Sequence, residues 1–207
     1  KAMLPKGKIR CSCGACILTL NDSRPKYSLL CSCEDCRLAL SWASQFGGKP
    51  PENLLYSIYL KSDFAEVIGF NSMRTTQLRD NARSTRIYCK KCYSCIGIDH
   101  INYANNVFMI QPDYCEQDFS TWIEPKAVIF LCDYPEKTVP LPSENIPIFH
   151  TFKYPQERQR FLDITPIGET LAPPNLPAVG KTIREIIATL NNTENLALQS
   201  GDELISC

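Results

Sequence analysis

Nine cysteines of this 207-residue chain lie in three tight groups, and thiol chemistry is therefore the first function to consider. The groups are Cys11, Cys13 and Cys16; Cys31, Cys33 and Cys36; and Cys89, Cys92 and Cys95. Cysteines this close in sequence rarely form a disulfide with one another, because a disulfide requires a particular Cα separation and Cβ direction. A metal ion needs several thiolates at one point, which this spacing allows. We therefore predict metal binding, since burial as small hydrophobic side chains would suit one or two cysteines but not nine.

The overall composition is that of an ordinary soluble globular protein, with 44% hydrophobic and 21% charged residues. The 22 Lys and Arg residues are balanced by 22 Asp and Glu residues, which argues against a nucleic-acid partner. The longest apolar run, about six residues, is far shorter than a membrane span, and the first residues lack the apolar region of a secretory signal. We expect a cytoplasmic protein without a membrane partner, because close-set cysteines in such a chain are more typical of metal sites than of disulfides.

Three segments resemble the motifs of a known family. Residues 11–15 read Cys-Ser-Cys-Gly-Ala, residues 31–37 read Cys-Ser-Cys-Glu-Asp-Cys-Arg, and residues 86–92 read Arg-Ile-Tyr-Cys-Lys-Lys-Cys. In their order, their spacing and the arginine before the third motif, they resemble the glutathione-dependent formaldehyde-activating (GFA) family, which includes the centromere protein V-like proteins. The similarity covers about residues 6–125.

The resemblance implies two zinc ions per chain. One is structural, in a closed site of four thiolates: Cys11, Cys13, Cys89 and Cys92. The other is catalytic, with an open position for substrate and three thiolate ligands: Cys31, Cys33 and Cys36. We also assign the adjacent Arg37 to the catalytic site. Zinc held by three thiolates is electron-rich, so it suits positioning of a thiolate, alkoxide or carbonyl oxygen better than strong acidification of water.

We therefore predict a zinc-dependent lyase, similar to carbon–sulfur lyases, that acts at a carbonyl- or imine-derived carbon of a small molecule in specialised metabolism. The family reaction joins glutathione and formaldehyde, so the expected partner is glutathione or another carboxylate-bearing compound. One alternative is an S-hydroxymethylglutathione synthase proper. Another is a non-enzymatic binding or chaperone module with two structural zinc ions, since the family shares its fold with a zinc-containing Rab-binding chaperone. A third is a redox or metal-buffer protein. A fourth protein ligand at the second site would favour the binding module.

The chain departs from the family pattern at four positions. Cys16 replaces an apolar residue, Ser32 replaces a histidine, Tyr93 replaces a glycine, and Cys95 is additional. We expect Cys16 and Cys95 to be buried as small hydrophobic side chains, with replacement of a metal ligand as the alternative. Because Ser32 replaces this histidine, we expect a small electrophile other than the formaldehyde that the family joins to glutathione.

Basic residues and one histidine could assist a substrate. Residues 74–91 carry six basic side chains and one acidic side chain, which would suit a substrate carboxylate. A solvated surface is the alternative interpretation of this charge. His100 is a candidate proton shuttle, although a lone histidine is more often structural.

The elements that must position these residues are mainly strands, and we predict a mainly β protein whose sheets are stapled by zinc. The predicted strands cover residues 16–20, 27–31, 54–60, 65–70, 85–89, 107–110 and 128–132. The only helix expected in this part is a short turn over residues 37–42. Residues 1–134 should form the GFA-like zinc-binding domain.

Residues 135–207 are predicted to form a C-terminal extension packed on that domain, with a separate second domain as the alternative. Nine of the fifteen prolines lie there, so the segment should wrap the surface and not join a sheet. We expect one or two short helices, over residues 156–162 and from Thr182 onward. Glu185 can complete a capping box with Thr182.

Overall fold

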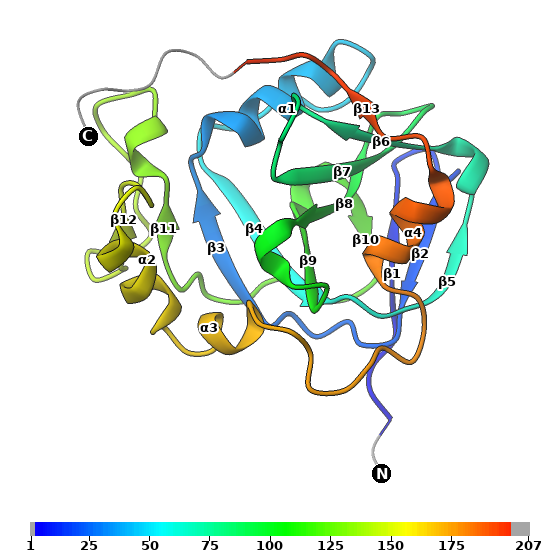
Figure 1. The fold of residues 1–207 in the computed structure, drawn as a ribbon. Helices are drawn as coiled ribbons and strands as arrows, with labels where there is room; N and C mark the ends of the chain where they lie inside the picture. Colours follow the sequence, from blue (N-terminus) through cyan, green and yellow to red (C-terminus); the bar gives the residue numbers. More distant parts are fainter. Residues whose placement is uncertain (1–2, 200–207) are drawn as a thin grey trace.

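Two β-sheets of short strands build this protein, in a computed structural model that describes residues 3–199 (Figure 1). The smaller sheet has the strand order β10-β1-β2-β5. Its strands are β1 (Gly7–Arg10), β2 (Ile17–Leu20), β5 (Phe64–Ile68) and β10 (Glu116–Gln117). The expectation of a mainly β protein is confirmed.

The larger sheet has nine strands in the order β12-β11-β3-β4-β9-β8-β7-β6-β13. They are β3 (Tyr27–Cys31), β4 (Leu55–Lys61), β6 (Met73–Gln77), β7 (Ser84–Cys89), β8 (Cys95–His100), β9 (Val107–Ile110), β11 (Val128–Ile129), β12 (Ile148–Phe149) and β13 (Glu194–Asn195). The described residues thus contain more strands than the seven predicted from the sequence. β6 was not predicted because its sequence is polar. Its pairing with β7 and the burial of Thr75 and Thr76 depend on neighbouring strands, which the local sequence does not show.

The helices are α1 (Glu34–Ser44), α2 (Pro155–Leu162), α3 (Ile167–Thr170) and α4 (Ile183–Leu190). The expectation of a short turn over residues 37–42 is wrong, because α1 runs for 11 residues. Cys33 caps its start by accepting a hydrogen bond from the backbone N–H of Cys36, and cysteine is not among the usual cap residues. The predicted capping box of Thr182 and Glu185 is confirmed at α4.

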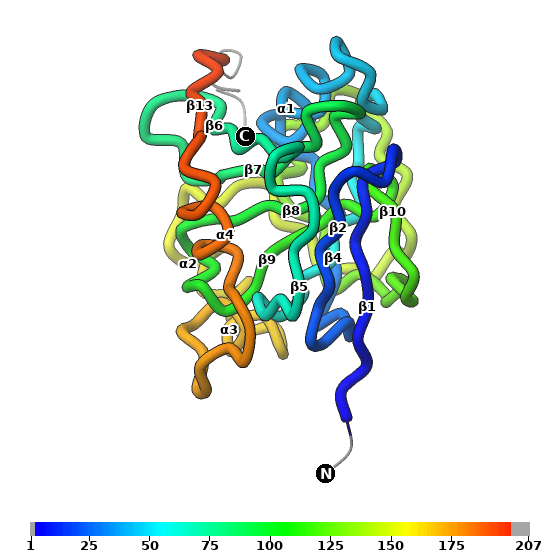
Figure 2. Tube along the Cα trace, turned by 90° about the vertical axis from the view of Figure 1, so that its right-hand side faces the viewer, coloured from blue at the N-terminus to red at the C-terminus, as the bar shows by residue number. Residues whose placement is uncertain are grey.

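The C-terminal extension contributes to the sheet and to both hydrophobic cores. β12 pairs in parallel with β11, and β13 pairs in parallel with β6, so the expectation that the extension stays outside the sheet is wrong. Each of these strands is a two-residue segment free of proline, and proline restricts only the positions that must donate a ladder hydrogen bond. Phe149, Phe161 and Ile167 join one core, and Ile183 and Ile186 join the other. Figure 2 shows α4 and β13 along the β6 side of the larger sheet.

In residues 3–199, no helix has the length and apolar character needed to cross a membrane.

Candidate metal centres

Four cysteines from two distant parts of the chain come together in one group. The Sγ atoms of Cys11, Cys13, Cys89 and Cys92 all lie within 4.8 Å of one another. The Cys11–Cys13 and Cys13–Cys89 sulfur distances are 3.6 and 3.7 Å. Thiolates bound at about 2.3 Å from a tetrahedral zinc ion stand about 3.8 Å apart, so the spacing fits a zinc site.

Two tight turns present these sulfurs. Gly14, with φ of +78°, follows Cys13 in a turn closed by the hydrogen bond from Gly14 N to Cys11 O. Backbone N–H groups also donate to the sulfurs, with Cys16 N 3.2 Å from Cys11 Sγ and Lys91 N 3.4 Å from Cys89 Sγ. Such donors favour the thiolate form that binds metal.

The second turn contains Tyr93 at the position where the resembled family has glycine. Its φ of 56° is left-handed and unfavourable for a side chain with a Cβ. The ring of Tyr93 stacks on Phe46, with centroids 4.9 Å apart, and its hydroxyl accepts a hydrogen bond of 2.9 Å from Arg74. These contacts offset the backbone strain and explain how tyrosine is accommodated.

The protonation equilibria at the four-cysteine group differ between its members. Burial raises the pKa of Cys11 to about 12. At Cys92 burial acts in the same direction, but hydrogen bonds from the Ser12 and Ser94 hydroxyls outweigh it and lower the pKa to about 5. A divalent cation would favour the thiolate form of all four cysteines.

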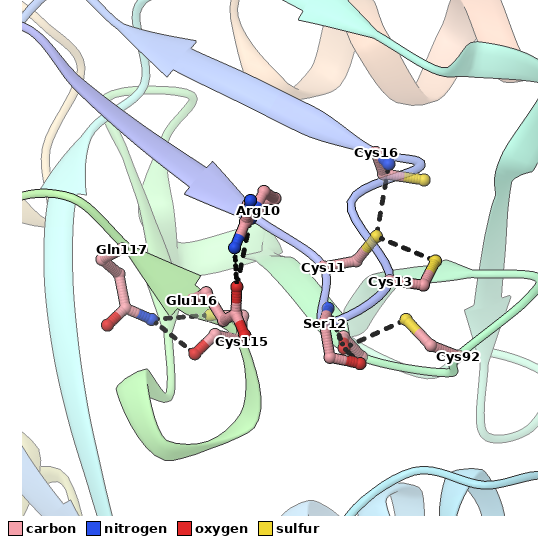
Figure 3. A network of polar contacts seen from close by, with 10 residues as sticks. Arg10, Cys11, Ser12, Cys13, Cys16, Cys92, Cys115, Glu116 and Gln117 are labelled. Carbon is pink, nitrogen blue, oxygen red and sulfur yellow. Dashed lines mark hydrogen bonds and ion pairs between the residues drawn. The ribbon is translucent and has the colours of Figure 1, made fainter.

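Cys16 lies next to this group but does not join it. In Figure 3 no contact is marked between its sulfur and the sulfurs of Cys11 or Cys13. The thiol of Cys16 instead donates to the carbonyls of Gly69 and Ser72, at 3.8 and 3.5 Å, and its side chain is fully buried. Cys95 is also buried in a hydrophobic core. The expectation that both are small core side chains is confirmed.

The second group consists of Cys31, Cys33 and Cys36, whose sulfurs again lie within 4.8 Å of one another. Cys31 ends β3, Cys33 caps α1, and Cys36 lies in the first turn of that helix. The backbone N–H of Cys33 donates to Cys31 Sγ at 3.5 Å, and that of Cys36 donates to Cys33 Sγ at 3.3 Å. Among residues 3–199, no other cysteine, histidine or carboxylate joins this group.

An arginine from β7 lies beside the second group. Arg86 is buried, and its Nη2 atom lies 3.9 Å from Cys36 Sγ. Burial opposes the charge of Arg86, but the Cys36 thiolate outweighs this and raises the pKa of the guanidinium. The thiols of Cys31 and Cys33, and then Arg86, hold the pKa of Cys36 well below its usual range. The only sequence signal for this role was the place of Arg86 before the third motif.

Arg37 occupies a different position. Its guanidinium donates to the backbone carbonyls of Ser32, Asn53 and Asp133, and it does not line the cavity described below. Ser32 itself is fully buried, and its Oγ has no hydrogen-bond partner in the described residues. Arg37 thus stabilises the backbone at Ser32, between Cys31 and Cys33. Its assignment to catalysis stays a prediction.

A cavity of about 1100 Å³ adjoins the second group and is lined in part by its three cysteines. Arg86 and His100 also line it. Burial, followed by the charges of Arg83 and Arg86, lowers the pKa of His100 to about 4. Its Nδ1 accepts a hydrogen bond of 3.0 Å from Asn102 N, so at neutral pH the ring proton is assigned to Nε2.

No protein-family model matches the chain, and no curated protein matches it either. The residues themselves show a mainly β protein with two cysteine groups. One has four members and the other three, and each could hold a metal ion such as zinc.

Proposed function

We propose that this chain is a zinc-dependent lyase of the formaldehyde-activating type, similar to carbon–sulfur lyases. The observation that carries the proposal is the unequal size of the two cysteine groups. Four sulfurs complete a tetrahedral structural site, whereas three leave one position for a substrate. The three-cysteine group also lines the cavity of about 1100 Å³, so the substrate would have a place beside the open position.

Residues around the cavity have distinct tasks in this proposal. When bound, zinc would supply a Lewis acid that orients a substrate thiolate or carbonyl oxygen. Arg86 would offset the negative charge of the three thiolates. Addition of a thiol to a carbonyl carbon forms a C–S bond and moves the thiol proton to the carbonyl oxygen. His100, which is neutral at pH 7, is proposed to stabilise that oxygen by donating a hydrogen bond from Nε2.

The lack of a fourth protein ligand at Cys31, Cys33 and Cys36 within residues 3–199 favours an enzyme over a module with two closed structural sites. The substitution Cys33→Ser tests this directly. We expect two zinc ions per wild-type chain and one in the variant, by elemental analysis. Circular dichroism should show that the variant remains folded. Nuclear magnetic resonance should show that it no longer catalyses the addition of thiols to aldehydes.

Cys16→Val is the matched control. Cys16 lies in a sequence group with the same spacing as the group of Cys33, but it belongs to neither metal group. The Cys16→Val variant should keep both zinc ions and full activity. Wild-type turnover by Cys33→Ser would contradict the proposal. Cys92→Ser removes a member of the four-cysteine group. If Cys33→Ser unfolds to the same extent as Cys92→Ser, both sites are structural.

A further inference from the structure

One wall of the cavity beside the three-cysteine group is built by the C-terminal extension, which lies outside the resemblance. The lining residues that the extension supplies include His150, Phe152, Lys153, Arg158, Phe161 and Leu171. The remaining wall comes from the β core, including Tyr59 and Tyr103. The ligand that fits this cavity is therefore decided by both parts of the chain.

The extension side of the cavity is aromatic and held in place by ring contacts. Phe152 lies 5.1 Å from Phe130 and 5.0 Å from Phe161, measured between ring centroids. Tyr59 and Tyr103 form an edge-to-face pair at 5.5 Å in the β core. Aromatic side chains of this kind bind flat or apolar ligand groups through large contact areas.

Three exposed cations line the same cavity: Arg83, Lys153 and Arg158. None of the three forms an ion pair within residues 3–199. Arg79 differs, because Asp35 neutralises it at 2.7 Å.

The buried Arg86 also lines the cavity, but its charge is paired with the Cys36 thiolate and is not counted here. The remaining carboxylates of the lining are Glu34 and Asp133, and Asp133 accepts a hydrogen bond from the backbone of Glu34. Cations therefore exceed carboxylates around the cavity, which favours a ligand that carries negative charge.

The cavity is far larger than a one-carbon substrate needs. About 1100 Å³ is available, whereas a water molecule occupies about 30 Å³ of liquid and drug-sized ligands occupy cavities of about 300–1000 Å³. A one-carbon aldehyde would leave most of the aromatic wall without contact.

We propose that the cavity binds an amphipathic organic acid, with an apolar body against Phe152 and Phe161 and its anionic group near Lys153 and Arg158. The reacting carbonyl or thiol end would then point toward the cysteines, and this last statement alone rests on the proposed lyase function. The ligand class follows from the cavity lining and can be tested without turnover.

The experiment measures binding of anilinonaphthalene sulfonate by fluorescence and its displacement by three small ligands. Phenylbutyrate carries both an apolar body and a carboxylate, phenylbutanol lacks the charge, and glutarate lacks the apolar body. We expect phenylbutyrate to displace the probe at the lowest concentration. The variant with both Lys153→Gln and Arg158→Gln should bind phenylbutyrate about fivefold more weakly and phenylbutanol equally well.

The control variant carries Lys126→Gln and Lys137→Gln, which removes two exposed positive charges outside the cavity. It should bind phenylbutyrate as the wild type does. Equal binding of phenylbutyrate and phenylbutanol by the wild type would overturn the inference, as would an unchanged affinity in the Lys153 and Arg158 variant. Phenylbutyrate binding at these residues, together with a wild type that joins no thiol to any aldehyde, would support the ligand class and overturn the lyase proposal.

Discussion

The guanidinium of Arg86 lies 3.9 Å from the sulfur of Cys36, and both side chains are buried. Arg86 belongs to β7 in the larger sheet, whereas Cys36 lies in the first turn of α1. A divalent cation with three thiolates would carry one net negative charge, and a buried charge is costly unless it is paired. Arg86 supplies that pairing charge from outside the ligand set.

Replacement of Arg86 should therefore weaken the three-cysteine site selectively. We expect Arg86→Met to lower zinc affinity there by about 10- to 100-fold, as is typical for groups that support metal ligands. Arg86→Lys should retain part of the affinity because it keeps the charge. Competition with a chromogenic chelator measures both sites, and an equal loss at the four-cysteine site would show general unfolding instead.

Cys16 and Cys36 should respond differently to the same substitution. Cys16→Val should keep both metal ions and cost less than about 1.5 kcal/mol of unfolding free energy, because the exchange nearly conserves volume in a hydrophobic core. Cys36→Val should lose one metal ion. Elemental analysis and urea denaturation measure these effects, and zinc loss from Cys16→Val would show that the four-cysteine site is built differently.

Metal removal from the four-cysteine group should unfold the protein. Cys11 and Cys13 follow β1 of the smaller sheet, while Cys89 ends β7 of the larger one, so a bound ion would tie the two sheets together. Its binding free energy would then be folding free energy. Cys92→Ser should leave little soluble protein, whereas Cys115→Ala, outside both groups, should not. Native-like circular dichroism of Cys92→Ser would rule out a structural role.

Stability should fall as the pH drops through the range between the unfolded and folded pKa values of His100. The folded pKa is about 4, below the ordinary value of 6.5. Between these values the unfolded chain binds more protons than the folded chain, so acid favours unfolding. His100→Gln should remove this contribution.

Urea denaturation at pH 7 and pH 5 provides the measurement for His100. The loss of stability between the two should be smaller in His100→Gln than in the wild type. Because metal release by acid affects both proteins alike, only the difference between them is assigned to the histidine. Identical losses would mean that His100 titrates normally in the folded protein.

The sequence predicted the elements whose signals are local. The strands around residues 17–20, 27–31 and 107–110 were predicted by runs of apolar residues, and the start of α4 by the capping box of Thr182 and Glu185. By contrast, the predicted helix was shorter than α1 because the residue that caps α1 is a cysteine. Strand β6 was not predicted because its burial depends on partners far along the chain. The two-residue strands β12 and β13 exist only through pairing with β11 and β6.

The sequence by itself determined that the cysteines cluster, because residues two or three positions apart cannot separate far in space. Its family resemblance also indicated which of them share a group, and the tertiary structure brings the same sets together. The sequence also predicted that Cys16 and Cys36 would differ, although they occupy equivalent places in two identical spacings, but only the tertiary structure shows the geometry that separates them. The backbone after Cys16 enters β2 and turns its thiol toward Gly69 and Ser72, whereas Cys36 starts a helix that holds its sulfur near Cys31 and Cys33. The cavity, its aromatic wall and its unpaired cations likewise required the fold, because they join residues of the extension to residues of the β core.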